Sequence, residues 1–82
     1  MTIETLNIEG LLVIIPRIFE DERGHFYESF NQDSFNDAVG VDTVFCQDNE
    51  SLSRKNVLRG LHFQNPPFAQ GKLVRVTQGA VL

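Results

Sequence analysis

Short apolar runs divided by glycine and proline turns limit the folds open to this sequence. Leu11–Pro16 is rich in β-branched residues and ends in proline, which predicts a buried or interface strand. Side chains of Gly24–Phe30 are predicted to alternate between two faces, with Phe26, Glu28 and Phe30 on one and His25, Tyr27 and Ser29 on the other, and alternation returns in Gln70–Val76. A charged turn, Glu20–Gly24, precedes the first of these runs. Evenly spaced strands of this kind predict an all-β sandwich or barrel.

One short helix is expected between the strands. Asn31 is a favourable N-cap, the apolar positions of Asp33–Val39 have helical spacing, and Gly40 stands where a terminating glycine belongs. Thr43–Asn49 begins apolar and ends in three polar residues able to contact a ligand, and the ordinary alternative is a strand that runs into a turn. Ser51–Asn56 is expected to be a polar loop, with turns at Asn65–Pro67 and Gln78–Gly79. Ala80–Leu82 begins a further strand, so we expect residues 1–82 to be one partial domain.

Composition narrows the class of protein. The chain has 82 residues, 41% hydrophobic, and a net charge of −4, which is typical of one small globular domain. No run approaches the ~20 apolar residues of a membrane helix, and no signal peptide is visible. The single cysteine, Cys46, has no internal disulfide partner, so a cytoplasmic protein is predicted. The acidic balance argues against a nucleic-acid partner but not against a small anionic ligand.

Val57–Gln64 contains one of the two histidines within an apolar run that predicts a strand. In a regular strand, Arg59 and His62 would lie on opposite faces. A bulge or kink at Gly60 is predicted to bring Arg59 toward the cavity lined by His62. The alternative interpretation is a core histidine that is hydrogen-bonded to a neighbour.

The polar residues favour chemistry beside a carbonyl group. A histidine serves as a base near neutral pH, and a cation such as Lys72 stabilises a developing oxyanion. Lys72 is alternatively a solvated lysine at a strand start, and Glu28, between two phenylalanines, is either functional or a charge that protects an edge strand. Gln47, Asn49, Arg23 and Arg59 would suit a phosphate-bearing substrate.

Metal and thiol chemistry fit less well. Gln64 stands where a metal-binding barrel would carry the second histidine of a His-x-His pair, so no metal site is predicted. Cys46 lies in an apolar strand pattern, and a buried cysteine is usually inert.

Four motifs together resemble one enzyme family. The chain is similar to the N-terminal portion of the cupin-like dTDP-4-dehydrorhamnose 3,5-epimerases. The motifs occur in the order and spacing of that family: Pro16–Phe19 with Asp21–Phe30, Phe45–Asn49, Val57–Gln64 and Gln70–Val76.

The resemblance implies an antiparallel jelly-roll barrel, of which this is the N-terminal half, in a homodimer with exchanged N-terminal strands. It implies epimerisation at carbons 3 and 5 of dTDP-4-dehydro-6-deoxyglucose, in dTDP-L-rhamnose synthesis, without a cofactor. It also implies that a tyrosine that reprotonates the opposite face, and a carboxylate that orients the histidine, lie beyond Leu82.

The resemblance also implies individual roles. His62 would remove the protons beside the 4-keto group, and Lys72 would stabilise the enolate. The remaining residues would contact the substrate or its nucleotide, some of them from the partner subunit: Arg23, Glu28, Gln47, Asp48, Asn49, Arg59, Phe19 and Phe26. Two alternatives stay open, an epimerase that inverts a single carbon and a non-catalytic binding or dimerisation module.

Overall fold

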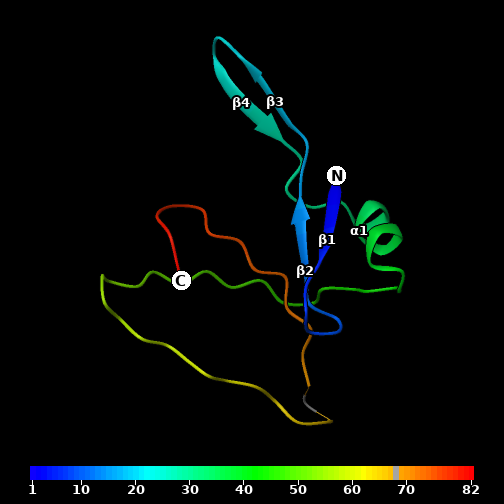
Figure 1. The fold of residues 1–82 in the computed structure, drawn as a ribbon, viewed down its shortest axis with the longest axis vertical. Helices are drawn as coiled ribbons and strands as arrows, with labels where there is room; N and C mark the ends of the chain where they lie inside the picture. The colour runs from blue at the N-terminus through cyan, green and yellow to red at the C-terminus, as the bar shows by residue number, and fades with distance from the viewer. Residues whose placement is uncertain (68) are drawn as a thin grey trace. The chain divides into compact units, whose positions relative to one another are not determined.

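The computed structural model describes residues 1–67 and 69–82, which form two compact units, Met1–Asn49 and Glu50–Leu82. Each unit is described by itself. The first contains all the regular elements of the described residues (Figure 1): β1 (Thr2–Thr5), β2 (Leu12–Ile15), β3 (Ile18–Asp21), β4 (Gly24–Tyr27) and α1 (Gln32–Val39).

β1 and β2 form an antiparallel hairpin whose register pairs Thr2 with Ile15 and Thr5 with Leu12. The Leu11 amide closes the connection by donating to the Ile8 carbonyl at 3.1 Å. The strand predicted at Leu11–Pro16 is confirmed as β2. β1 was missed because Thr2–Ile8 has only a weak apolar pattern, and Ile3 is its one half-buried residue within the strand.

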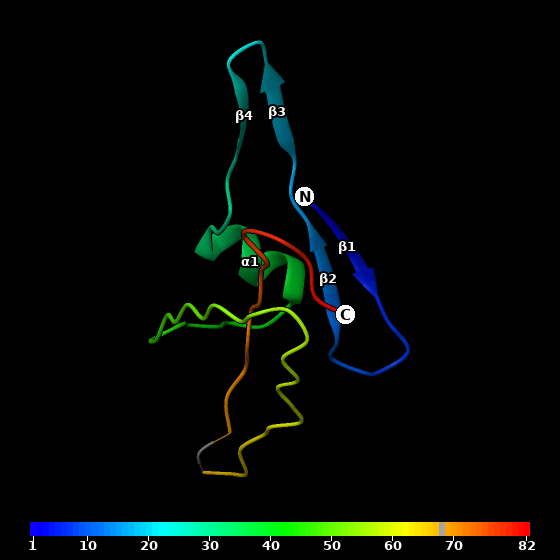
Figure 2. The same cartoon turned by 90° about the vertical axis from the view of Figure 1, so that its left-hand side faces the viewer.

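β3 and β4 form a second antiparallel hairpin, in which Asp21 pairs with Gly24 across a two-residue turn. The β1–β2 hairpin and the β3–β4 hairpin are separate from each other in both views (Figures 1 and 2). Gly24 has a φ of +136°, which side-chain-bearing residues rarely adopt, although nothing lies within 4 Å of the position its Cβ would take. The predicted charged turn is confirmed, but it is narrower than expected because β3 continues to Asp21.

The strand predicted at Gly24–Phe30 is shorter in the structure. β4 ends at Tyr27, so Glu28 follows the strand and does not share a strand face with Phe26 and Phe30. The physical reason is the register, because Ile18, the first residue of β3, already pairs with Tyr27.

The helix is confirmed with both of its caps. The Asn31 side chain accepts a hydrogen bond from the Ser34 amide at 3.0 Å, which satisfies one of the free N–H groups of the first turn. Gly40 ends the helix with a φ of +82°, and its amide donates to the Asn36 carbonyl at 2.8 Å.

The first unit has a small aromatic cluster beside α1. The ring centroids of Phe30, Phe35 and Phe45 lie 5.3–5.7 Å apart, in tilted and edge-on arrangements. Phe35 and Phe45 are half-buried, and none of the described side chains is fully buried.

The strands predicted at Val57–Gln64, Gln70–Val76 and Ala80–Leu82, and the strand considered at the start of Thr43–Asn49, are wrong in this structure, because these segments have no regular structure. A strand forms only where a neighbouring strand accepts its backbone hydrogen bonds. Among the described residues of Glu50–Leu82 no such pairing is present, and Leu61 and Phe63 are 103% and 83% exposed.

The turns predicted in the second unit do occur. Lys55–Asn56 forms a turn within the predicted polar loop, Pro66–Pro67 forms another, and residues 77–79 bend around Gly79, whose φ is +83°. Turn residues act through their own backbone preferences, which need no distant partner.

The regular elements of the described residues are thus four strands in two antiparallel sheets and one short helix, which agrees with an all-β class. α1, the one helix in this part of the chain, is too short and too polar to cross a membrane.

Replacing the N-cap tests the helix. Asn31→Ala removes the acceptor for the Ser34 amide, so we expect α1 to lose about 1 kcal/mol of stability. The helical ¹³Cα shifts of Gln32–Val39 report this loss. Asn31→Asp keeps the acceptor and should retain those shifts, and equal shifts in Asn31→Ala and the parent would contradict the cap.

Candidate functional site

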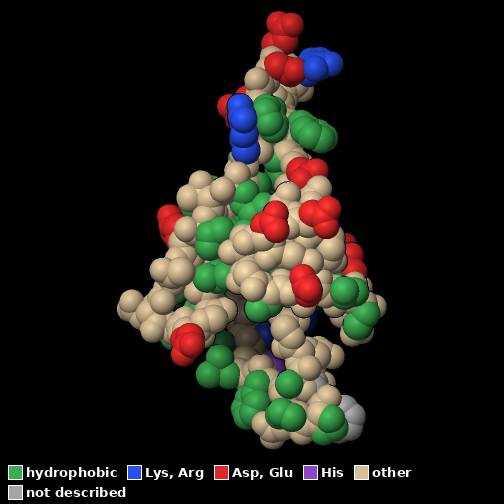
Figure 3. All heavy atoms as spheres, turned by 90° about the vertical axis from the view of Figure 1, so that its right-hand side faces the viewer, with side chains coloured by type: hydrophobic (Ala, Val, Ile, Leu, Met, Phe, Trp, Pro, Cys, Tyr) green, Lys and Arg blue, Asp and Glu red, His purple; other side chains and the backbone are tan. Residues whose placement is uncertain are grey.

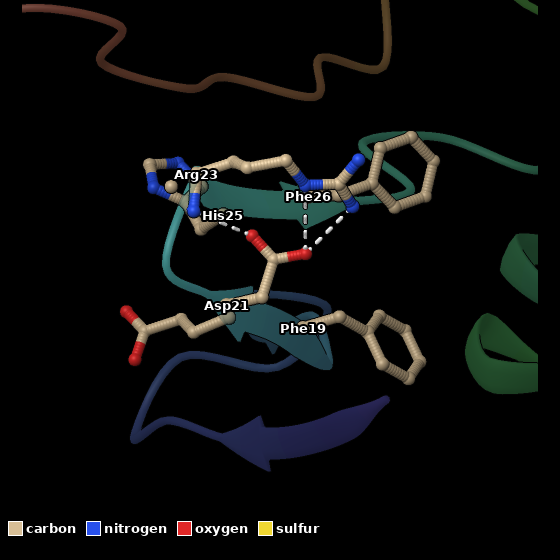
Figure 4. A pocket seen from close by; sticks show the side chains of 7 residues that line it. Phe19, Asp21, Arg23, His25 and Phe26 are labelled. Atoms are coloured by element: carbon tan, nitrogen blue, oxygen red, sulfur yellow. Dashed lines mark hydrogen bonds and ion pairs between the residues drawn. The ribbon is translucent and has the colours of Figure 1, made fainter.

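The β3–β4 hairpin carries an open hollow of about 430 Å³. The register places Phe19 directly opposite Phe26, so both rings project from the same face of the hairpin. Figure 4 shows these rings beside the Asp21–Arg23 pair. The lining residues are Phe19, Glu20, Asp21, Arg23, Gly24, His25 and Phe26.

Asp21 holds Arg23 through a fork of hydrogen bonds. The Arg23 side chain donates from Nη2 and Nε to Asp21 Oδ2 at 2.7 and 3.2 Å, and its amide donates to Oδ1 at 2.9 Å. These hydrogen bonds, first those from the side chain and then the backbone one, lower the pKa of Asp21. Both side chains are exposed, so the pair orients the guanidinium more than it stabilises the fold.

A second arginine lies against Phe19. The Arg17 guanidinium carbon is 4.7 Å from the centroid of the Phe19 ring, which is within the range of a cation–π contact. On the β3–β4 hairpin, basic and acidic side chains are adjacent, with apolar side chains next to them (Figure 3). The hairpin therefore combines aromatic faces with oriented cations.

His25 and Tyr27 lie two residues apart on β4, and their rings are stacked with centroids 6.0 Å apart. This pair confirms the alternation predicted for His25 and Tyr27. Glu28 is exposed immediately after the strand.

Gln47, Asp48 and Asn49 are exposed in an irregular segment that follows the half-buried Phe45. Cys46 is an exposed free thiol, so the expectation that it is buried in a strand is wrong. The reason is that no strand pairs with this segment to cover it.

In the second unit, Arg59, His62 and Lys72 are all exposed. Arg59 Nη2 donates to the Leu52 carbonyl at 3.4 Å. A bulge at Gly60 is wrong, because no strand is present there to interrupt, whereas the unusual backbone angle expected of a kink is present as a φ of +150°.

The structure thus brings together three of the predicted site residues, Phe19, Arg23 and Phe26, on one hairpin. The sequence-based interpretation missed Asp21 as the partner of Arg23 and Arg17 as the cation over Phe19. The residues of each pair are two positions apart in the sequence. An aspartate at the start of a tight turn, followed two residues later by an arginine within the turn, is the signal that would have predicted the first pair. Among the described residues, no group of three or more His, Cys, Asp or Glu is arranged to hold a metal ion.

Comparison with known proteins shows which family the chain belongs to. The family model described as dTDP-4-dehydrorhamnose 3,5-epimerase matches residues 5–82. The chain belongs to the dTDP-4-dehydrorhamnose 3,5-epimerase family. No solved structure matches the chain.

Individual relatives agree with the family. A dTDP-4-dehydrorhamnose 3,5-epimerase of Escherichia coli strain K12 is 56% identical over 81 residues, covering 99% of this chain and 44% of the relative. The epimerase of Pseudomonas aeruginosa is 51% identical over 76 residues, 93% of this chain and 41% of the relative. That of Methanothermobacter thermautotrophicus is 48% identical over 75 residues, 92% of this chain and 40% of the relative. The chain therefore spans less than half the length of these relatives.

Replacing Arg23 tests whether its side chain donates hydrogen bonds to Asp21. Arg23→Gln should raise the pKa of Asp21 toward its ordinary value, because the charged donors that favour the carboxylate are lost. A pH titration of the Asp21 carboxyl carbon by NMR measures this change. Since the folded pKa is the lower one, the contribution of Asp21 to hairpin stability is present above its unfolded pKa and is lost as the pH falls through the folded pKa.

Arg17→Gln is the matched control. It removes the cation over Phe19 but no hydrogen bond to Asp21, so the titration of Asp21 should be unchanged. A parental Asp21 titration in Arg23→Gln would show that the fork is absent in solution.

Proposed function

We propose that this chain supplies part of the active site of a dTDP-4-dehydrorhamnose 3,5-epimerase. The substrate would be dTDP-4-dehydro-6-deoxyglucose, epimerised at carbons 3 and 5 in the synthesis of dTDP-L-rhamnose. The observation that carries the proposal is the family match over residues 5–82, a range that contains every residue assigned a role here.

In the proposed reaction His62 is the general base. Hydrogens on the carbons beside a 4-keto group are acidic because the electron pair released by C–H cleavage moves onto the keto oxygen. His62 takes the proton and becomes an imidazolium, and the sugar becomes an enolate. An acid on the opposite face then returns a proton to the same carbon, which inverts it and restores the ketone.

Lys72 would stabilise the enolate. An ammonium group held near the keto oxygen favours the negative charge that develops there during proton removal, and it favours the neutral ketone much less. Lys72 is exposed in this structure, so its side chain is accessible to a ligand.

The arginines would anchor the diphosphate. Asp21 accepts from two of the five side-chain N–H donors of Arg23, so the others can contact phosphate oxygens while the fork keeps the guanidinium oriented. Arg59 would supply the second guanidinium. Phe19 and Phe26, which face each other across the hairpin, offer aromatic surface for the nucleotide base.

The polar residues would contact the sugar and its nucleotide. Gln47 and Asn49 offer both donors and acceptors to hydroxyl groups, and Asp48 and Glu28 offer acceptors. All four side chains are exposed.

We also propose a jelly roll and a homodimer with exchanged N-terminal strands. In two-stranded sheets every strand has an unpaired edge, which invites pairing with further strands. Apolar residues on these strands, such as Ile15 and Ile18, are 43% and 53% exposed, so added strands would also cover apolar surface.

The base is tested in a chimera in which these 82 residues replace the matching 81 residues of the Escherichia coli relative. His62→Asn should lower turnover by about 10²–10⁴-fold, which is the usual contribution of a general base. The KM for the sugar nucleotide should change little because the phosphates are held elsewhere. The measurement is turnover, together with deuterium uptake at carbons 3 and 5 in deuterated water.

The matched control is Asn65→Ala, a polar residue close by in the sequence with no proposed role, which should keep parental turnover. Unchanged turnover in His62→Asn would assign the base to another residue. In the parent chimera, exchange at both carbons supports the 3,5-epimerase. Exchange at one carbon supports the single-carbon alternative, and binding without exchange supports the non-catalytic module.

Lys72→Met should lower kcat by about 10²–10³-fold, as the loss of one oxyanion donor usually does. Lys55→Met, which removes another exposed lysine, should leave kcat unchanged. A KM effect without a kcat effect would show that Lys72 binds the ground state and does not stabilise the enolate.

A further inference from the structure

We infer that Gln32 and Asn36, two amide side chains one turn apart on α1, are positioning residues for the substrate-contacting segment Gln47–Asn49. They would act through the Thr43 backbone, whose N–H and C=O groups they bind, and would not touch the substrate themselves. The inference rests on the proposed function, because it requires that this segment contacts the substrate.

The hydrogen bonds that carry the inference form a closed network. Asn36 Oδ1 accepts from the Thr43 amide at 2.9 Å and from Gln32 Nε2 at 3.0 Å. Gln32 Nε2 also donates to the Thr43 carbonyl oxygen. Gln32 and Asn36 are four residues apart, so they lie on the same face of α1.

The chemistry of these groups is matched. The two N–H groups of the Gln32 amide have two acceptors, and the two lone pairs of Asn36 Oδ1 have two donors. Thr43 therefore has both its N–H and its C=O bound by side chains, as a neighbouring strand would bind them. The amide donor at 32 and the oxygen acceptor at 36 together make this arrangement.

A second anchor lies two residues farther along the chain. The Phe45 ring contacts Phe30 and Phe35, with centroids at 5.6 and 5.3 Å. Between the anchors, Val44 is 82% exposed, whereas Thr43 and Phe45 are half-buried. Two fixed points two residues apart define both where this segment leaves α1 and the direction it takes.

Gln47 follows the second anchor by only two residues, a reach of about 7 Å for extended chain. A shift of the anchors would therefore move the amide of Gln47 relative to the substrate. His62 and Lys72 lie in another segment of the sequence, so the loss of the anchors should weaken binding and spare proton removal.

The network offers matched variants. Asn36→Leu removes the acceptor of two hydrogen bonds, and Gln32→Glu removes both donors. Asn36→Asp keeps an acceptor oxygen of the same size in the same place. Asp37→Ala is the control, since Asp37 is an exposed residue on the same helix and has no proposed role.

The experiment measures kcat and KM of the chimera with dTDP-4-dehydro-6-deoxyglucose. We expect Asn36→Leu and Gln32→Glu to raise KM by about tenfold and to change kcat less than about twofold, because ground-state binding alone is affected. Asn36→Asp and Asp37→Ala should stay near the parent. Asn36→Leu and Gln47→Ala should combine less than multiplicatively, because each removes the same substrate contact.

Amide hydrogen exchange at Thr43 supplies a readout independent of the substrate. Faster exchange in Asn36→Leu with a raised KM supports the inference, and if that variant does not fold, Gln32→Glu is measured in the same way. Faster exchange with a parental KM, or fully multiplicative effects with Gln47→Ala, overturns the inference and leaves the proposed function standing. A parent chimera that neither binds nor converts the substrate overturns the proposed function and the inference with it.

Discussion

Backbone hydrogen bonding decides which parts of this chain become regular. An N–H or C=O group needs a partner, and the partner must be either nearby in the sequence or held in place by other structure. The two hairpins pair strands that are adjacent in the sequence, and α1 bonds to itself, so both find their partners nearby. The segments Val57–Gln64 and Gln70–Val76 also have sequence patterns that predict strands, but no strand among the described residues pairs with them, and they stay irregular and exposed.

The same rule explains how the hairpin assembles its part of the candidate site. Register alone places Phe19 opposite Phe26, and a two-residue turn places Arg23 within reach of Asp21. The resulting cation is exposed yet oriented by a carboxylate, which leaves donors for an anionic ligand. Arg17 adds a second guanidinium against the face of Phe19.

Local signals in the sequence predicted the local structure well. Asn31 and Gly40 marked the ends of the helix because capping depends on a few adjacent residues. The run that became β2 and the turns near Gly24 and Pro66 were also predicted. β1 was missed because its pattern is weak. The assigned roles of His62 and Lys72 depend on what surrounds them in space, which periodicity does not encode.

By itself, the sequence determined the helix with its caps, the β2 strand, the main turns and, through its motifs, the family. Only the tertiary structure decided that Phe19 would lie opposite Phe26 and that Gln32 and Asn36 would hold the Thr43 backbone. The physical reason is that periodicity records which face of an element is apolar, whereas a hydrogen-bond partner is set by where two side chains meet once the chain has turned.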